Sequence, residues 1–422
     1  MELPQTMDSR SCCLMNTSIH ESETIVNSLK EKNLYELFSA HVIKHLITIL
    51  IAVFSIGYHG KTVDFANHSE CHRTTLGYFL NHGKWDETIL ETAVRMSVLS
   101  MIYEEAKRSG KPILCIVDDT ISSKTVPSSK AEFPIESADF HYSHLKGKSD
   151  YGHQAIAVLL SCNGITLLYT IKMYDKSVSK IDIMCKLAQE LPIAPTLSYL
   201  LCDRWYTCKK LMEAFVKKGF YTIGALKTNR VLYPHGIKKS VEELAETLKS
   251  KDAVSSFHSV TVKGRKYYVY RYEGNLNGIE NAVILLTFPE GKLFQMDTLR
   301  AFLCTNASIS DAQILSFYVQ RWEIEVFFRE SKRRLAFDKY QIRSAKGIQR
   351  FWLIASLAHL LACCSSSTFH FSEGYKNIAS KIQEEQITFL SIHLTQLLVT
   401  SDLKRQIGAF TAASARRSKR VS

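Results

Sequence analysis

The sequence predicts an α/β fold in which helices flank a mixed sheet, with a helical region at the N-terminus. Two short apolar runs, residues 112–117 and 198–202, each end at acidic residues, as buried strands that lead into a functional site do. Asn163-Gly164 joins two further strand patterns, and this dipeptide is a strong hairpin signal. The helical pattern KIDIMCKLAQEL lies between the hairpin and the second run. Strand, hairpin, helix and strand in this order imply a mixed sheet flanked by helices.

Residues 1–90 are expected to form a helical region that contacts DNA, although they contain no clear helix-turn-helix signature. The segment HLITILIAVFSIGYHG, which begins at His45, is its most apolar part. Its uninterrupted apolar run is shorter than the roughly 20 residues that span a bilayer, so a buried helix is expected and no membrane contact.

The rest of the chain is expected to form a core that is interrupted once. Its first part covers residues 91–229, and it ends with the helix KKLMEAFVKKGF and the strand YTIGALKT. Residues 230–308 alternate as strands and form a mostly β insertion. The core resumes over residues 309–370, and residues 371–422 form a C-terminal helical segment with a basic tail, FTAASARRSKRVS, expected to be disordered.

The charge of the chain favours a polyanionic partner. Lys and Arg number 53 and Asp and Glu 41, which leaves a net charge of +12. Residues 204–240 contain nine Lys or Arg against one acid, and residues 329–350 contain eight against two. Such clusters are typical of contacts with a DNA backbone.

The 11 cysteines are scattered, and several lie in apolar runs where a reduced cysteine behaves as a small core residue. This pattern favours a reducing cytoplasm. His68, Cys71 and His72 are too close in sequence for the usual zinc patterns, so a zinc site is not favoured there.

The segment from Ser316 to Tyr340, SFYVQRWEIEVFFRESKRRLAFDKY, is predicted to form one helix with an unusual polar stripe. Tyr318, Arg321, Glu325 and Lys332 lie at offsets of 0, 3, 7 and 14 residues. At about 100° per residue all four fall within a stripe roughly 60° wide. Taken alone, Arg321 and Glu325 are also explained as an ordinary surface pair, worth about 0.2 to 0.5 kcal/mol.

Three acids form a candidate catalytic set. Asp118 or Asp119 ends the first strand, Asp203 ends a later strand, and Glu325 lies on the striped helix. An Asp at the end of a strand is more often a turn or cap residue, so only their joint order in a basic chain favours catalysis.

On these residues the chain resembles DDE transposases of the insertion-sequence-four superfamily. The family signature Y-x2-R-x3-E-x6-K is matched at Tyr318, Arg321, Glu325 and Lys332, and the resemblance extends from about residue 73. It implies a ribonuclease-H-like core with a β insertion, and cut-and-paste DNA transposition. It also implies that Asp119, Asp203 and Glu325 are the catalytic and metal-binding residues. Asp119 is preferred over Asp118 because the family places this Asp directly before Thr, Ser or Gly.

The chemistry of these residue types fits phosphoryl transfer. Carboxylates bind two Mg²⁺ ions, which Mn²⁺ can replace, and such a pair promotes in-line displacement at phosphorus. Tyr318, Arg321 and Lys332 are expected to bind DNA phosphates. The resemblance implies double-stranded DNA as the partner, namely terminal inverted repeats and target DNA, and a homodimer on DNA in the bacterial cytoplasm, associated with the nucleoid.

One departure from some relatives concerns a base-flipping Trp in the insertion. No Trp falls between Tyr206 and Phe317, which puts a hairpin intermediate in doubt. Two alternatives remain: a ribonuclease-H-like nuclease without strand transfer, and a non-catalytic DNA-binding protein derived from a transposase.

Overall fold

The fold is described from a computed structural model, which covers residues 22–143, 146–250, 255–276, 279–397 and 408. The chain divides into a helical unit and an α/β unit. The helical unit comprises residues 1–93, 131–136 and 331–422, and the α/β unit comprises residues 94–130 and 137–330. Helices α6 (Glu87–Ser109) and α12 (Trp322–Arg334) each contribute residues to both units. The basic tail expected after residue 409 lies outside the described residues.

The helical unit contains α1 (Glu23–Glu31), α2 (Leu34–Leu37), α3 (Ala40–Phe54), α4 (Thr62–Ala66), α5 (Arg73–Asn81), α13 (Ala345–Cys364) and α14 (Phe371–Leu397). Helix α3 is buried over most of its length, which confirms the expectation for the apolar segment at His45. By length and composition alone α13 could cross a membrane, but 83% of its apolar window is buried within the protein. Both apolar helices therefore have the burial expected of core helices.

A buried arginine holds part of the helical unit together. The Arg350 side chain is 0% exposed and pairs with Glu87 at 2.9 Å. It also donates to the backbone carbonyls of Phe79, Leu80 and Trp85. Arg350 belongs to the second basic cluster of the sequence, but its guanidinium is fully engaged inside the protein. Part of that cluster is thus structural.

The core of the α/β unit contains β1 (Leu114–Ser123), β2 (Asp139–Ser143), β3 (Lys148–Cys162), β4 (Ile165–Tyr174), α7 (Lys180–Glu190), β5 (Ser198–Cys202), α8 (Lys209–Val216) and β6 (Phe220–Leu226). The strands lie in the order β4-β3-β1-β5-β6. Strands β1, β5 and β6 are parallel, and β3 is antiparallel to both β1 and β4. This is a ribonuclease-H-like arrangement, as predicted.

The hairpin prediction is also confirmed. Strands β3 and β4 pair directly around Asn163-Gly164. Asn163 has φ 49° and Gly164 has φ 88°, the left-handed conformations that a two-residue turn between twisted strands requires.

The segment that follows β6 extends the same sheet. It contains β7 (Val231–Leu232), β8 (Lys239–Ser240), α9 (Val241–Thr247), β9 (His258–Val262), β10 (Arg265–Leu276), β11 (Ile279–Pro289) and β12 (Arg300–Cys304), with short 3₁₀ turns at Pro234–Gly236 and Met296–Thr298. Strand β12 pairs with β6, and β11 and β10 follow it outward. An apolar cluster, which includes Leu244, Leu286 and Phe288, packs around α9 and these strands.

The predicted single helix over residues 316–340 is wrong. The structure has α11 (Asp311–Val319) and α12, separated at Gln320 and Arg321. The amide of Arg321 donates to Tyr318 and that of Glu323 to Gln320, so the chain winds more tightly here than an α-helix. The helical wheel at about 100° per residue, which placed the four residues on one stripe, does not apply across this turn because the turn is not α-helical. Tyr318 therefore does not belong to a continuous helical stripe with Glu325.

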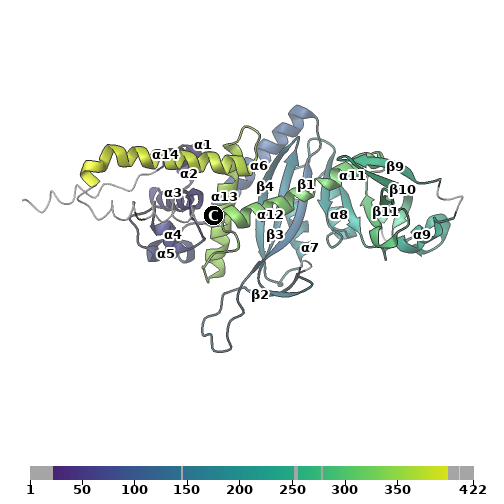
Figure 1. The fold of residues 1–422 in the computed structure, drawn as a ribbon, viewed down its shortest axis with the longest axis horizontal. Helices are drawn as coiled ribbons and strands as arrows, with labels where there is room; N and C mark the ends of the chain where they lie inside the picture. Colours follow the sequence, from purple (N-terminus) through teal and green to yellow (C-terminus); the bar gives the residue numbers. More distant parts are fainter. Residues whose placement is uncertain (1–21, 144–145, 251–254, 277–278, 398–407, 409–422) are drawn as a thin grey trace, which may run out of the picture. The chain divides into compact units, whose positions relative to one another are not determined.

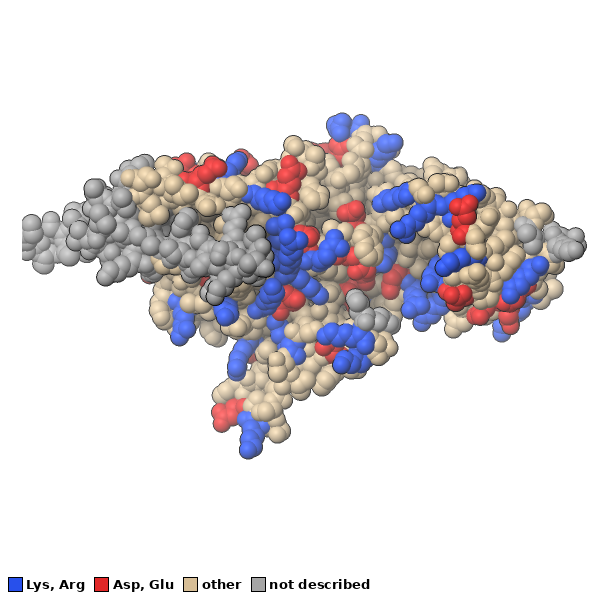
Figure 2. Space-filling model, viewed as in Figure 1, with Lys and Arg blue, Asp and Glu red and all other residues tan. Residues whose placement is uncertain are grey.

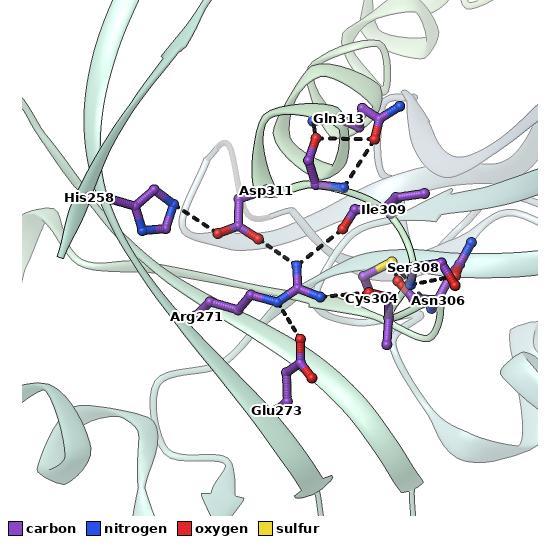
Figure 3. Close-up of polar contacts among 11 residues, drawn as sticks. His258, Arg271, Glu273, Cys304, Asn306, Ser308, Ile309, Asp311 and Gln313 are labelled. Atoms are coloured by element: carbon purple, nitrogen blue, oxygen red, sulfur yellow. Dashed lines mark hydrogen bonds and ion pairs between the residues drawn. The ribbon is translucent and has the colours of Figure 1, made fainter. Parts of the chain in front are cut away.

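Strand β10 anchors the start of α11 (Figure 3). The Arg271 guanidinium donates to Asp311 Oδ1 at 2.6 Å and to the carbonyls of Ala307 and Ile309. His258 Nε2 on β9 lies 2.9 Å from the other oxygen of Asp311. Asp311 is buried, so this network fixes the entrance to α11 from the inserted strands.

Candidate active site

The two faces of the core sheet decide which acids meet. Ile116 on β1 packs in one apolar cluster with Ile324 and Phe327 of α12, and Figure 1 shows α12 crossing the core sheet. Side chains alternate along a strand, and β1 pairs with β3 without a bulge. Asp118 therefore lies on the α12 face with Ile116, whereas Asp119 points to the opposite face.

On the α12 face, Arg321 joins Asp118 to Glu325. Its Nη1 donates to Asp118 Oδ2 at 2.6 Å, and its Nη2 lies 3.4 Å from Glu325 Oε1. Arg321 and Asp118 are largely buried, with 17% and 18% of their side chains exposed, while Glu325 is 36% exposed. The tight turn before α12 thus brings a carboxylate from β1 and one from α12 to the same guanidinium.

Burial dominates the electrostatics of Asp118. It raises the pKa of this carboxyl from 3.8 to about 7, and the negative charges of Asp119 and Asp203 add to the increase. Arg321 opposes the shift, and its own pKa is raised by Asp118, Tyr318 and Glu325 against the effect of burial. A second cation close to Asp118 would relieve this repulsion.

Asp203 follows β5 directly and lies close enough to Asp118 to influence its pKa. Its Oδ1 accepts hydrogen bonds from the backbone amides of Trp205 at 2.8 Å and Tyr206 at 3.1 Å. Tyr199 and Leu201 of β5 pack on the α12 face, and alternation places Asp203 on that face too. Asp118, Asp203 and Glu325 are therefore the acids that the fold places at one face of the core sheet.

Asp119, the acid preferred from the sequence, faces other partners. Its carboxylate accepts from Gln154 Nε2 at 2.6 Å, Lys180 Nζ at 2.7 Å and the Tyr206 hydroxyl at 3.0 Å. Strand β1 also continues to Ser123, beyond the acids that were expected to end it. The geometry favours Asp118 over Asp119 because only Asp118 shares a face with Glu325.

The three residues expected to bind DNA have different environments. Tyr318 packs on Phe302 with ring centroids 4.6 Å apart, and burial raises the pKa of its phenol to about 12 although Arg321 lowers it. Arg321 is paired with the two carboxylates described above. Lys332 lies in the last turn of α12 with Arg333 and Arg334, and Figure 2 shows basic side chains around this helix.

The donor chemistry fits a hard divalent cation, because all three gathered acids offer oxygen ligands and no sulfur or nitrogen is needed. Burial is the main cause of the raised pKa of Asp118, and the smaller contributions of Asp119 and Asp203 show that their charges reach this carboxyl. Within the described residues, no three His, Cys, Asp or Glu side chains lie close enough together as they stand to hold an ion. The side chains of Asp118, Asp203 and Glu325 would have to converge around one.

Sequence reasoning missed the residues that surround Asp119. Gln154, Lys180 and Tyr206 come from β3, α7 and the turn after β5, and no motif links them. The one available signal was the alternation of side chains along β1, which places Asp119 on the face opposite Asp118.

Residues 109–361 match a family model described as "Transposase DDE domain". The chain belongs to this family. The match spans more than half of the sequence and includes all four acids discussed above. The protein is therefore a DDE transposase, an enzyme that cleaves and joins DNA, and transposases of this family use divalent metal ions.

Comparison with solved structures gives a distant likeness. A piggyBac transposase in a synaptic complex with hairpin DNA matches with 12% identity and a TM-score of 0.40. The match covers 91% of this chain and 82% of the other. Among curated proteins, none matches the sequence.

Proposed function

We propose that this DDE transposase is a member of the insertion-sequence-four superfamily that carries out cut-and-paste transposition, with Asp118, Asp203 and Glu325 as its catalytic carboxylates. The observation that carries the proposal is the contact of Arg321 with both Asp118 and Glu325, on the face of the sheet that also receives Asp203. Asp118 takes the place of Asp119, the acid preferred from the sequence, because the Asp119 side chain points to the opposite face of the sheet.

Each residue has a role that follows from its position. Asp118, Asp203 and Glu325 would hold two Mg²⁺ or Mn²⁺ ions, which when bound polarise the attacking and leaving oxygens of an in-line displacement. Arg321 holds Asp118 and Glu325 on one side of the site, and its planar guanidinium also suits a phosphate oxygen pair. Burial of Tyr318 against Phe302 fixes the turn that carries Arg321.

The DNA that fits this activity is the pair of terminal inverted repeats and a target duplex. Lys332 and its basic neighbours at the end of α12 would contact phosphates. Cutting two ends in concert favours a homodimer assembled on DNA, acting in the cytoplasm on the bacterial nucleoid.

The test is a set of charge-removing, shape-conserving substitutions. Asp118→Asn, Asp203→Asn and Glu325→Gln are each expected to abolish cleavage of an oligonucleotide that carries the inverted repeat, because each removes the charge of a metal ligand. Gel-shift measurements should show DNA binding largely retained. The matched control is Asp182→Asn, which changes an exposed Asp on α7 that is paired with Lys210.

Near wild-type cleavage by the Asp118 variant would remove that residue from the site. A strand-transfer assay separates the remaining alternatives. Cleavage without joining would identify a nuclease, whereas DNA binding with neither reaction at any Mg²⁺ or Mn²⁺ concentration would identify a non-catalytic descendant.

A further inference from the structure

Asp119 is held by side chains from three separate parts of the α/β unit. Gln154 of β3 donates to its Oδ1, while Lys180 at the start of α7 and Tyr206 after β5 both donate to its Oδ2. Both oxygens of this carboxylate are therefore engaged by the protein. Such a set of contacts fixes the relative positions of the elements that supply them.

The two partners on Oδ2 are themselves well fixed. The Lys180 side chain is only 12% exposed, and its ammonium lies 4.7 Å from the ring centroid of Trp205 and 5.3 Å from that of Tyr174. Tyr206 is buried, and this burial together with the charge of Asp119 raises the pKa of its phenol well above the ordinary value. The hydroxyl therefore stays protonated and donates a hydrogen bond to Asp119 Oδ2.

Tyr206 also connects Asp119 to Asp203. The backbone amide of Tyr206 donates to Asp203 Oδ1 at 3.1 Å, beside the amide of Trp205 at 2.8 Å. The Thr207 hydroxyl closes the same turn by donating to the Asp203 carbonyl at 2.8 Å. A displacement of the Tyr206 ring would thus move the amides that orient the Asp203 carboxylate.

We propose that Asp119 is a positioning residue, which acts through the Tyr206 hydroxyl to orient the Asp203 carboxylate toward Asp118 and so sets the divalent-cation affinity of the pair. The proposal rests on the proposed function, in which Asp118 and Asp203 are ligands and Asp119 is not. It explains why two adjacent acids occur on β1. Asp118 lies at the proposed metal site, and Asp119 anchors the turn after β5 that carries Asp203.

The test uses Asp119→Asn, Tyr206→Phe and the double variant in the full chain. Mn²⁺ binding without DNA is measured by calorimetry, and thermal unfolding is followed in parallel. Tyr206→Phe removes only the hydroxyl, so it isolates positioning from the loss of a nearby charge. It is expected to weaken Mn²⁺ binding about 10-fold, the usual order for one hydrogen bond to a charged group.

Coupling between the two positions decides the mechanism. Adding Tyr206→Phe to Asp119→Asn should weaken Mn²⁺ binding less than Tyr206→Phe does in the wild type, since the neutral Asn is already a weaker acceptor for the Tyr206 hydroxyl. In cleavage assays, the single variants should need more Mn²⁺ but approach the wild-type kcat at saturation. Asp182→Asn should leave Mn²⁺ affinity and cleavage unchanged. Lys180→Met, which removes the other partner on Oδ2, is a milder variant for use where Asp119→Asn does not fold.

Three results would overturn the proposal. Loss of cleavage in Asp119→Asn at every Mn²⁺ concentration, with Tyr206→Phe normal, would make Asp119 itself a ligand. A lower Tm with unchanged Mn²⁺ affinity would leave these contacts a purely structural role. Additive losses of affinity would break the link through Tyr206. If the proposed function is wrong, the result is different: Asp118→Asn cleaves DNA, whatever the Asp119 variants do.

Discussion

At the scale of single residues, strand β1 presents two adjacent acids, Asp118 and Asp119, to opposite faces of the core sheet. The order of acids and the spacing of the signature helix predict Asp203 and Glu325 as catalytic residues, and that role stays a prediction. The choice between Asp118 and Asp119 depends on which face of β1 the helix α12 covers, and that is a tertiary fact. The family pattern, in which the catalytic Asp directly precedes Thr, Ser or Gly, favours Asp119. Strand alternation and the contact with Arg321 favour Asp118.

The environment of Asp118 predicts an effect of pH on stability. Its pKa is about 7 in the folded protein and close to 3.8 when unfolded. Between these values the folded state binds the extra proton, so this residue makes the free energy of unfolding fall as pH rises from about 4 to 7. Asp118→Asn removes that dependence. We expect the Tm of the variant, relative to wild type, to increase from pH 5 to pH 8 in metal-free buffer.

The control for this measurement is again Asp182→Asn. The pKa of Asp182 is lowered, chiefly by its hydrogen bond with Lys210, so its contribution changes only at more acidic pH. Its Tm profile should parallel that of wild type from pH 5 to pH 8. A parallel profile for the Asp118 variant would contradict a raised pKa at Asp118.

At the scale of elements, the strands and helices of the core followed from apolar runs and turn signals, but the break between α11 and α12 did not. Residues 316–334 keep a helical pattern through Gln320 and Arg321, and no Gly or Pro marks the interruption. The turn is stabilised by tertiary contacts of Arg321 and Tyr318, which periodicity does not reveal. Likewise, β12 pairs with β6 although the sequence suggested only a β insertion of unspecified pairing.

The network in Figure 3 predicts how α11 is held in place. Arg271→Met would leave the buried Asp311 carboxylate without its main cation, and such a loss costs about 3 to 5 kcal/mol. We expect urea unfolding to show a loss of this order. Arg271→Met with Asp311→Asn should be more stable than Arg271→Met alone, because the uncompensated charge is gone. The reverse order would show that Asp311 does not depend on Arg271 for charge compensation.

At the scale of the whole molecule, the net charge indicates a polyanionic partner, but it does not identify the residues that contact that partner. The +12 charge fits an enzyme that acts on DNA. In the second basic cluster, however, Arg350 is buried against Glu87, Arg343 donates to the Phe133 carbonyl, and Arg334 donates to Ser372. A count of basic residues does not separate side chains that contact the protein itself from those available to DNA, since both look alike in sequence.

The salt dependence of DNA binding distinguishes basic residues that contact DNA from those that contact the protein itself. Lys332→Ala is expected to reduce the slope of log affinity against log salt by about 0.9 on duplex DNA, because one phosphate contact and its released counterion are lost. Lys249→Ala is the matched control, since Lys249 lies beyond α9 in an exposed pair with Glu246 and should leave the slope unchanged. Removal of residues 416–422, which contain four Arg or Lys side chains, should weaken binding to random and inverted-repeat DNA alike while cleavage at saturating protein persists. A Lys332 variant with an unchanged slope but no cleavage would assign this residue to the architecture of α12 instead of the DNA interface.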